Sequence, residues 1–273
     1  MAKRNEITIL GSGTSTGIPM VGCYCDICMS KNPKDKRYRS SILISTNSNT
    51  FLIDTTPDFR TQALAHNIND LDFVIITHEH SDHTNGIDDL RPLTFGPPKK
   101  TIPIYTNSYC AQDLKVRYPY IFDQKTIFKD RPILGGGIAS LELKEIENNF
   151  NHDSEVFETL MLEHGYTKTL GIIHESFAYL IDCNEIKDEQ LELMKNKNLD
   201  LIIIDCCQIE KHDTHLNYFQ AFDYIKKIAP KRAGLIHMNH SLSHEFLETE
   251  IEMSFKDSSI EVFPCFDNQI LNY

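Results

Sequence analysis

Short runs of apolar and β-branched residues recur along the chain, separated by segments in which apolar residues have helical spacing. The runs are too short for helices and are typical of strands. Strands are predicted at residues 7–10, 41–45, 51–54, 73–77, 102–105, 156–162, 177–182, 201–206, 235–237 and 260–263. Helices are predicted at residues 58–66, 108–117, 186–195, 218–228 and 243–253. Because strands and helices alternate throughout, the pattern indicates an α/β protein.

Several predicted strands are apolar at every position, as in the run Leu201-Ile202-Ile203-Ile204. A strand of this kind is buried on both faces, so helices must cover the sheet that contains it. Neither a low-complexity linker nor a sequence repeat interrupts the chain. The sequence therefore predicts a layered domain that spans residues 1–273 as a single unit.

The composition is that of a globular protein, with 41% hydrophobic and 24% charged residues. This content excludes a wholly disordered or fibrous chain. The 39 acidic residues outnumber the 27 basic ones, which gives a formal net charge of −12 and a pI near 5.4. Tight, sequence-independent binding of nucleic acid needs a surplus of Lys and Arg, so this balance disfavours a nucleic-acid partner.

The N-terminus lacks an apolar stretch long enough for a signal peptide, and no later run reaches the length of a membrane span. We therefore expect a cytoplasmic protein without a membrane partner. In a reducing compartment the 8 cysteines are not expected to form a disulfide framework. Three of them, Cys23, Cys25 and Cys28, lie so close together that metal binding is the better explanation. The others are expected to be buried apolar residues: Cys110, Cys183, Cys206, Cys207 and Cys265.

The predicted strand at residues 73–77 leads directly into a loop that contains three histidines and a carboxylate. These are His78, His80, Asp82 and His83. Imidazole and carboxylate suit zinc, manganese or iron, and the alternation of His78 and His80 lets a tight loop direct two rings at one ion. Asp82 and His83 can then serve a second ion. The loop is therefore a candidate metal site.

This His-x-His-x-Asp-His signature, together with the earlier strand and carboxylate at residues 51–54, resembles the metallo-β-lactamase superfamily. The resemblance spans nearly the whole chain. It implies a four-layer αββα sandwich, in which two sheets lie face to face between helical layers. It also implies a dinuclear metal site at the strand ends, with Asp54 supporting the ligands rather than binding metal.

The resemblance further implies three later ligands, which match His164, Asp182 and His237. One metal would then be held by His78, His80 and His164, the other by Asp82, His83 and His237, and Asp182 would bridge the two. His152 and His174 compete with His164, and Asp205 competes with Asp182. His66 and His244 fall in helical segments and are expected at the surface.

A narrower resemblance rests on the opening Gly11-Ser12-Gly13, the cysteine trio and the late pair His237 and His240. Together these features resemble the phosphoribosyl cyclic phosphodiesterases of the carbon–phosphorus lyase pathway. The resemblance implies a closed structural zinc site of Cys23, Cys25, Cys28 and His240, and it suggests a homodimer. It also implies that His215 protonates the leaving group. A dinucleotide-binding interpretation of the glycines at residues 11–17 fails, because the glycine spacing is wrong and Pro19 stands where a helix should continue.

The expected function is therefore hydrolysis of a small cyclic phosphate ester, such as a phosphoribosyl 1,2-cyclic phosphate. Two divalent ions, manganese or zinc, would hold the attacking hydroxide between them. Asp82, as a ligand, and His215, as the proton donor, are the expected catalytic residues. The competing hypotheses are a transfer-RNA-maturing nuclease, a thioesterase or lactonase of the same superfamily, and a non-catalytic metal-binding protein.

Overall fold

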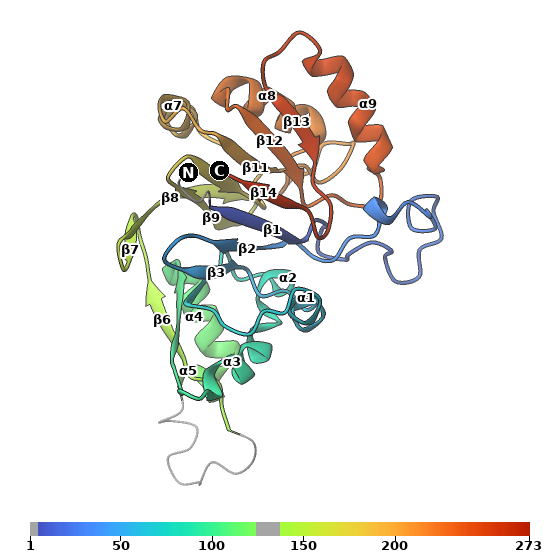
Figure 1. Cartoon of the computed structure of the whole chain (residues 1–273). Coiled ribbons are helices and arrows are strands. Elements are labelled where there is room, and N and C mark those ends of the chain that lie inside the picture. The colour runs from blue at the N-terminus through green and yellow to red at the C-terminus, as the bar shows by residue number, and fades with distance from the viewer. Residues whose placement is uncertain (1–4, 124–136) are drawn as a thin grey trace.

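The computed structural model describes residues 5–123 and 137–273. Two seven-stranded sheets lie face to face, with helices on the two outer faces (Figure 1). The first sheet has the order β14-β1-β2-β3-β4-β5-β6 and the second β13-β12-β11-β10-β9-β8-β7. This arrangement is the predicted four-layer αββα sandwich.

The strands of the first sheet are β1 (Glu6–Gly11), β2 (Ser41–Ser45), β3 (Thr50–Ile53), β4 (Phe73–Ile75), β5 (Ile102–Thr106), β6 (Leu141–Glu145) and β14 (Ile270–Asn272). Those of the second sheet are β7 (Phe150–His152), β8 (Glu155–His164), β9 (Thr167–His174), β10 (Phe177–Leu180), β11 (Leu201–Asp205), β12 (Arg232–Ile236) and β13 (Glu261–Pro264). The α-helices are α1 (Phe59–Ala65), α2 (Ser81–Thr84), α3 (Arg91–Phe95), α4 (Ser108–Arg117), α5 (Pro119–Phe122), α7 (Asp188–Asn196), α8 (Tyr218–Ile228) and α9 (His244–Phe255). Two short 3₁₀ helices are η1 (Pro33–Asp35) and η2 (Ile87–Leu90).

The all-apolar strands are buried on both faces, as their sequences predict. In β11, Leu201 and Ile203 point into the core between the sheets, whereas Ile202 and Ile204 pack against the outer helices α7, α8 and α9. Aromatic rings fill the space between the sheets, where Phe51 stacks on Phe73 at 4.5 Å and meets Phe157 edge-on at 5.3 Å. Burial of such side chains is the main driving force for folding. The two sheets therefore share one apolar core.

Parallel strands bring the candidate site to one edge of each sheet. Strands β3, β4, β5 and β6 run parallel in the first sheet, and β10, β11, β12 and β13 in the second. The carboxyl ends of parallel neighbours lie at the same edge, where the connecting loops can hold polar side chains. Within the described residues, no helix is both long and apolar enough to cross a membrane.

Every predicted strand and helix has a counterpart in the structure, but β6, β7, β9, β14, the short helices α2, α3 and α5 and both 3₁₀ helices were not predicted. One prediction about a side chain is wrong, because His244 is buried and only 2% exposed. Its backbone N–H donates to Asp35 at 2.8 Å, and its ring meets Phe266 edge-on. The N-terminal turn of α9 therefore packs against two distant segments instead of facing solvent.

Candidate metal centre

The polar residues of the site follow strand ends and adopt an unusual backbone conformation. Asp54 comes directly after β3, Asp182 two residues after β10, and His237 directly after β12. All three have positive φ angles, of 67°, 51° and 64° respectively. Non-glycine residues rarely adopt this left-handed region, and such strain gathers at functional sites. The three residues lie where their strands end, with Asp54 against His83 and His237 against Asp182.

Three imidazole rings form the first cluster. His80 Nδ1 lies 3.0 Å from His78 Nε2 and 3.1 Å from His164 Nε2. Nitrogen atoms bound tetrahedrally to one zinc ion at 2.0–2.1 Å would be roughly 3.3 Å apart, so the spacing suits one metal. His164 Nδ1 donates to the carbonyl of Thr214 at 2.7 Å, which leaves Nε2 without a hydrogen and free to bind.

A second cluster contains Asp82, His83, Asp182 and His237. His83 Nε2 lies 3.1 Å from carboxylate oxygens of both Asp82 and Asp182, and His237 Nε2 lies 3.3 Å from Asp182 Oδ1. Yet His83 Nε2, His237 Nε2 and Asp182 Oδ2 are buried without a hydrogen-bond partner. Buried polar atoms without partners are rare and need an explanation. A cation coordinated by these converging atoms supplies one, so the donor set fits a second metal.

Asp182 lies between the two clusters. Its Oδ1 is 3.9 Å from His164 Nε2 and 3.3 Å from His237 Nε2. Asp205 Oδ2 accepts hydrogen bonds from His215 Nδ1 at 2.9 Å and from the Cys183 amide at 3.1 Å. A carboxylate oxygen of Asp205 also lies within 4.8 Å of ligand atoms of Asp182, His215 and His237. Asp182 therefore lies next to ligands of both clusters, whereas Asp205 contacts His215 and a backbone amide.

Asp54 supports the cluster from behind, as expected. One of its oxygens accepts from His83 Nδ1 at 2.8 Å, and the Thr77 amide donates to the other at 2.8 Å. Burial alone would lower the pKa of His83, but the charges of Asp182, Asp82 and Asp54 outweigh it and raise that pKa well above its usual value. Burial likewise opposes ionisation of Asp182, whose pKa is nevertheless held well below its usual range by His237 and His83. The surrounding residues thus stabilise the charged forms of both His83 and Asp182.

His215 borders the same site. Its ring stacks on that of His237 with a centroid distance of 4.8 Å and an interplanar angle of 20°. Burial lowers the pKa of His215, but the charge and hydrogen bond of Asp205 outweigh it and raise that pKa to about 9. The surroundings of the ring therefore favour its protonated form. The side chain is partly buried, and its Nδ1 also lies 3.7 Å from Asp182 Oδ1.

The sequence pattern of the β-lactamase superfamily domain matches residues 49–238, which is more than half of the chain. The chain belongs to the metallo-β-lactamase superfamily. The matched segment contains every residue of the two clusters but neither the cysteine trio nor His240.

Among solved structures, the chain is similar to one described as a new diphosphatase from the PhnP family, with 30% identity and a TM-score of 0.87. That similarity covers 100% of this chain and 98% of the other. The short form of human tRNase Z is similar in fold alone, with 17% identity and a TM-score of 0.64 over 98% of each chain.

A curated relative, the octanoyltransferase of Porphyromonas gingivalis, is 36% identical over 245 residues. The matched part is 88% of this chain and 47% of the relative. The chain thus spans about half the length of that relative, and the name of the longer protein describes the longer protein only.

The two histidines that competed with His164 lie elsewhere in the superfamily fold. His174 ends β9 in the core between the sheets, where its ring stacks on Phe157 at 4.6 Å and its Nδ1 pairs with the Tyr273 hydroxyl at 2.6 Å. His152 pairs with the Tyr105 hydroxyl at 3.0 Å. His164 is therefore the one of the three that joins His78 and His80.

The cysteine trio and His240 also meet, although they are more than 200 residues apart in sequence. His240 Nδ1 lies 3.2, 3.5 and 3.7 Å from the sulfurs of Cys23, Cys25 and Cys28. Sulfur and nitrogen ligands of one tetrahedral zinc would be roughly 3.5 Å apart, so the donor set fits a closed site. A hydrogen bond from the Cys28 backbone, followed by hydrogen bonds with the side chains of Cys23, His240 and Cys28, outweighs burial and lowers the pKa of the Cys25 thiol to about 6.

Sequence reasoning missed one side chain at the centre. The five remaining cysteines are buried as predicted, but the sulfur of Cys207 lies within 4.8 Å of ring nitrogens of His215 and His237. It also contacts the Thr14 hydroxyl at 3.8 Å. The feature that could have identified Cys207 as part of the site is its position just after β11, at the same sheet edge as Asp182 and His237. Composition alone gave no reason to separate Cys207 from the other buried thiols.

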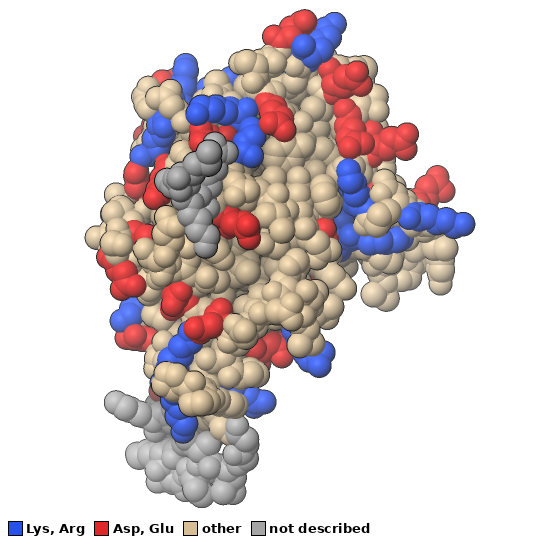
Figure 2. Space-filling model, in the orientation of Figure 1, with Lys and Arg blue, Asp and Glu red and all other residues tan. Residues whose placement is uncertain are grey.

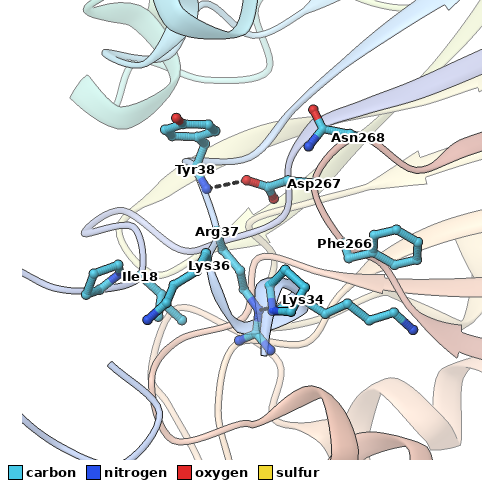
Figure 3. Close-up of a pocket in the computed structure, with 10 residues that line it drawn as sticks. Ile18, Lys34, Lys36, Arg37, Tyr38, Phe266, Asp267 and Asn268 are labelled. Carbon is cyan, nitrogen blue, oxygen red and sulfur yellow. Dashed lines mark hydrogen bonds between the residues drawn. The ribbon is translucent and has the colours of Figure 1, made fainter. Parts of the chain in front are cut away.

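A cavity of about 580 Å³ lies apart from these clusters, between the segment that follows the cysteines and the β13–β14 loop (Figure 3). Its polar groups have partners within the protein: the Tyr38 amide donates to Asp267 at 2.6 Å, and the buried Arg37 guanidinium donates to the Leu242 carbonyl at 2.8 Å. The first contact joins this segment to the β13–β14 loop, and the second joins it to the loop that contains His240. The cavity contains none of the candidate ligands.

Proposed function

We propose that the protein is a metal-dependent hydrolase of small phosphodiesters, most simply of a cyclic ribosyl phosphate. The observation that carries the proposal is the position of Asp182, which belongs to the second cluster and whose Oδ1 lies 3.9 Å from His164 Nε2 of the first. Two divalent ions, when bound, would supply an activated water and stabilise the charge that gathers on phosphorus. The proposed set for one ion is His78, His80 and His164, and for the other Asp82, His83 and His237.

The surrounding residues would orient the ligands and move one proton. Asp54 and the Thr214 carbonyl accept from the Nδ1 atoms of His83 and His164, which keeps the Nε2 atoms directed at the centre. His215, protonated because Asp205 stabilises its charged form, would donate its proton to the departing alkoxide. Asp205 would then hold the neutral ring in place for the next cycle.

A second candidate is hydrolysis of a diphosphate ester. It is favoured by the 30% identical structure described as a diphosphatase, which this chain matches over its whole length. Both reactions place a phosphoryl group at the metals and differ in the leaving group, which is an alkoxide in one and a phosphate in the other. A phosphate leaves as a stable anion, so the role proposed for His215 matters less in the second reaction.

Nuclease and acyl-hydrolase functions have weaker support. Basic and acidic side chains are mixed over the face in Figure 2, without the continuous basic stripe that a transfer-RNA substrate would favour. The name of the curated relative, which is about twice as long, makes an octanoyl thioester a useful acyl substrate to test.

We also propose that the protein works in a reducing compartment, since none of its eight cysteines is paired in a disulfide.

The test is a substrate panel with metal-free protein reloaded with manganese or zinc. The panel holds bis(4-nitrophenyl) phosphate, a ribosyl 1,2-cyclic phosphate, a dinucleoside diphosphate and an octanoyl thioester. We expect the phosphodiesters to be hydrolysed fastest, and Asp82→Ala to abolish turnover. Faster cleavage of the dinucleoside diphosphate would select the second candidate, and faster cleavage of the thioester would assign an acyl hydrolase. Inactivity of metal-loaded protein on every substrate would favour a non-catalytic metal-binding protein.

A further inference from the structure

The turn between β8 and β9 holds an exposed tyrosine at the metal centre. The two residues of the turn, Gly165 and Tyr166, directly follow the candidate ligand His164. The Tyr166 side chain is 88% exposed, yet its hydroxyl lies 3.4 Å from His80 Nε2. Single exposed aromatic residues are common and need no explanation by themselves. This one needs an explanation because it contacts a candidate ligand.

The turn is held rigidly in this position. Gly165 has a φ of 62°, and a Cβ at this residue would lie 2.5 Å from Thr214 Cγ2. The backbone therefore needs glycine both for its conformation and for its close approach to the His215 loop. The Gly165 amide also donates to Asn184 at 3.0 Å. Tyr166 thus projects from a fixed support.

The hydrogen-bond pattern leaves the Tyr166 hydroxyl hydrogen free. The Nδ1 atom of His80 faces His78 and His164, so as a metal ligand it would carry no hydrogen. The hydrogen of His80 is then on Nε2, which donates to the Tyr166 oxygen. A phenol that accepts in this way can still donate its own hydrogen. Among the residues that the structure describes, the hydroxyl has no second partner, which leaves solvent or a bound substrate to accept that hydrogen.

We propose that Tyr166 is a substrate-binding residue, whose ring packs against a cyclic ester group and whose hydroxyl donates to an oxygen of the bound phosphate ester. This inference deepens the proposed function and rests on it for the identity of the reacting group. A flat, rigid aromatic ring offers contact area at little entropic cost, which suits a sugar or aryl group. Substrates with a ring on the ester oxygen would therefore be preferred over short alkyl esters.

The experiment measures binding and does not require turnover. Calorimetry of manganese-loaded protein compares phenyl phosphate with methyl phosphate for wild type, Tyr166→Ala and Tyr166→Phe. Aromatic contacts and neutral hydrogen bonds are each worth about 2–10-fold in affinity. We expect wild type to prefer phenyl phosphate, Tyr166→Ala to lose that preference, and Tyr166→Phe to keep it while binding both esters about 2–10-fold more weakly. The matched control is Tyr109→Ala, at a tyrosine that is 70% exposed on α4 and belongs to neither cluster.

Three results would overturn the inference. These are a wild type without preference for phenyl phosphate, a Tyr166→Ala variant that keeps the preference, and a Tyr166→Ala variant that loses bound manganese. The last result would show that Tyr166 only holds His80 in place. The proposed function fails separately, since wild type could bind phenyl phosphate through Tyr166 and still hydrolyse no phosphodiester.

Discussion

Asp182 is the carboxylate whose Oδ1 lies within 4 Å of a histidine from each ligand cluster, and it can be compared directly with Asp205. We expect Asp182→Ala to abolish phosphodiester hydrolysis and to reduce the binding of both ions. Asp205 contacts His215 and a backbone amide instead, and loss of such a supporting residue costs about 10–100-fold in activity. Asp205→Ala should therefore retain both ions and measurable turnover.

Metal content per chain, measured alongside turnover for both variants, checks this ranking. Each substitution removes one buried carboxylate, so each variant is the control for the other. Full metal content in Asp182→Ala with metal loss in Asp205→Ala would move the bridging role to Asp205.

His215 can be tested through the basicity of the leaving group. A nitrophenolate departs as a stable anion, whereas a sugar alkoxide must gain a proton as its bond to phosphorus breaks. General acid catalysis is commonly worth about 10²–10⁴-fold. We expect His215→Ala to cause a loss of this size on a ribosyl or alkyl phosphodiester and a much smaller loss on bis(4-nitrophenyl) phosphate.

The measurement is the ratio of kcat/KM values for the two substrates, with metal content determined in parallel. Equal losses on both substrates would give His215 a role in positioning the substrate or supporting the metals. Unchanged turnover of both substrates would show that His215 is a surface residue without a role in catalysis.

Among the elements, the segment that contains the cysteine trio depends on its predicted zinc site. The structure describes no helix or strand within residues 20–30, so the ligands are the expected source of order there. A closed zinc site contributes directly to the free energy of folding. We expect Cys25→Ser and His240→Ala to lose one zinc per chain and to unfold at a lower temperature, as measured by metal analysis and thermal denaturation.

A serine at position 207 provides the matched control, because Cys207 is not part of the cysteine cluster. Cys207→Ser should keep this zinc. If Cys25→Ser and His240→Ala both retained full zinc and wild-type thermal stability, the segment would be ordered by its backbone contacts alone.

The positions of strands and helices could be predicted because the spacing of apolar residues along the chain indicates which side chains are buried. The ends of the strands could not be located as well. Residues 177–182 were predicted as one strand, whereas β10 ends at Leu180. Asp182 and His237 take left-handed conformations that local sequence preferences do not favour. Their conformations depend on contacts with the opposite sheet. Strand β14 was missed because its three residues, which pair with β1, are too few to show a period.

The sequence pattern and the family resemblance identified the residues that the structure brings together in the two clusters. The His-x-His-x-Asp-His signature is local, so its residues could be identified from spacing alone. His164 is preferred over His174 in the sequence because His174 falls in a strand-like run, yet in the structure both histidines end strands and both are buried. The burial of His244 and the place of Tyr166 depend on contacts between distant segments, for which local patterns carry no signal.

At the scale of the whole molecule, the metal centre joins the two sheets at their shared edge. His78, His80, Asp82 and His83 come from the loop and short helix after β4, whereas His164, Asp182 and His237 come from the second sheet. The two sheets are otherwise held together by their shared apolar core. Metal ions bound there would act as cross-links between the halves of the sandwich.

Removal of metal should therefore weaken the whole fold as well as abolish activity. Ions that bind only the folded state stabilise it by mass action, by about 4 kcal/mol at a free concentration 1,000 times Kd. We expect a mild chelator to remove the ions at the two His and Asp clusters, lower the unfolding temperature and stop hydrolysis, while the zinc at the closed cysteine site remains. Returning manganese should restore both properties, and the Cys25→Ser variant, treated in the same way, should retain no zinc. Calorimetry with metal analysis at each step checks this order, and an unfolding temperature that stays constant after the loss of the first ions would show that the centre does not cross-link the sheets.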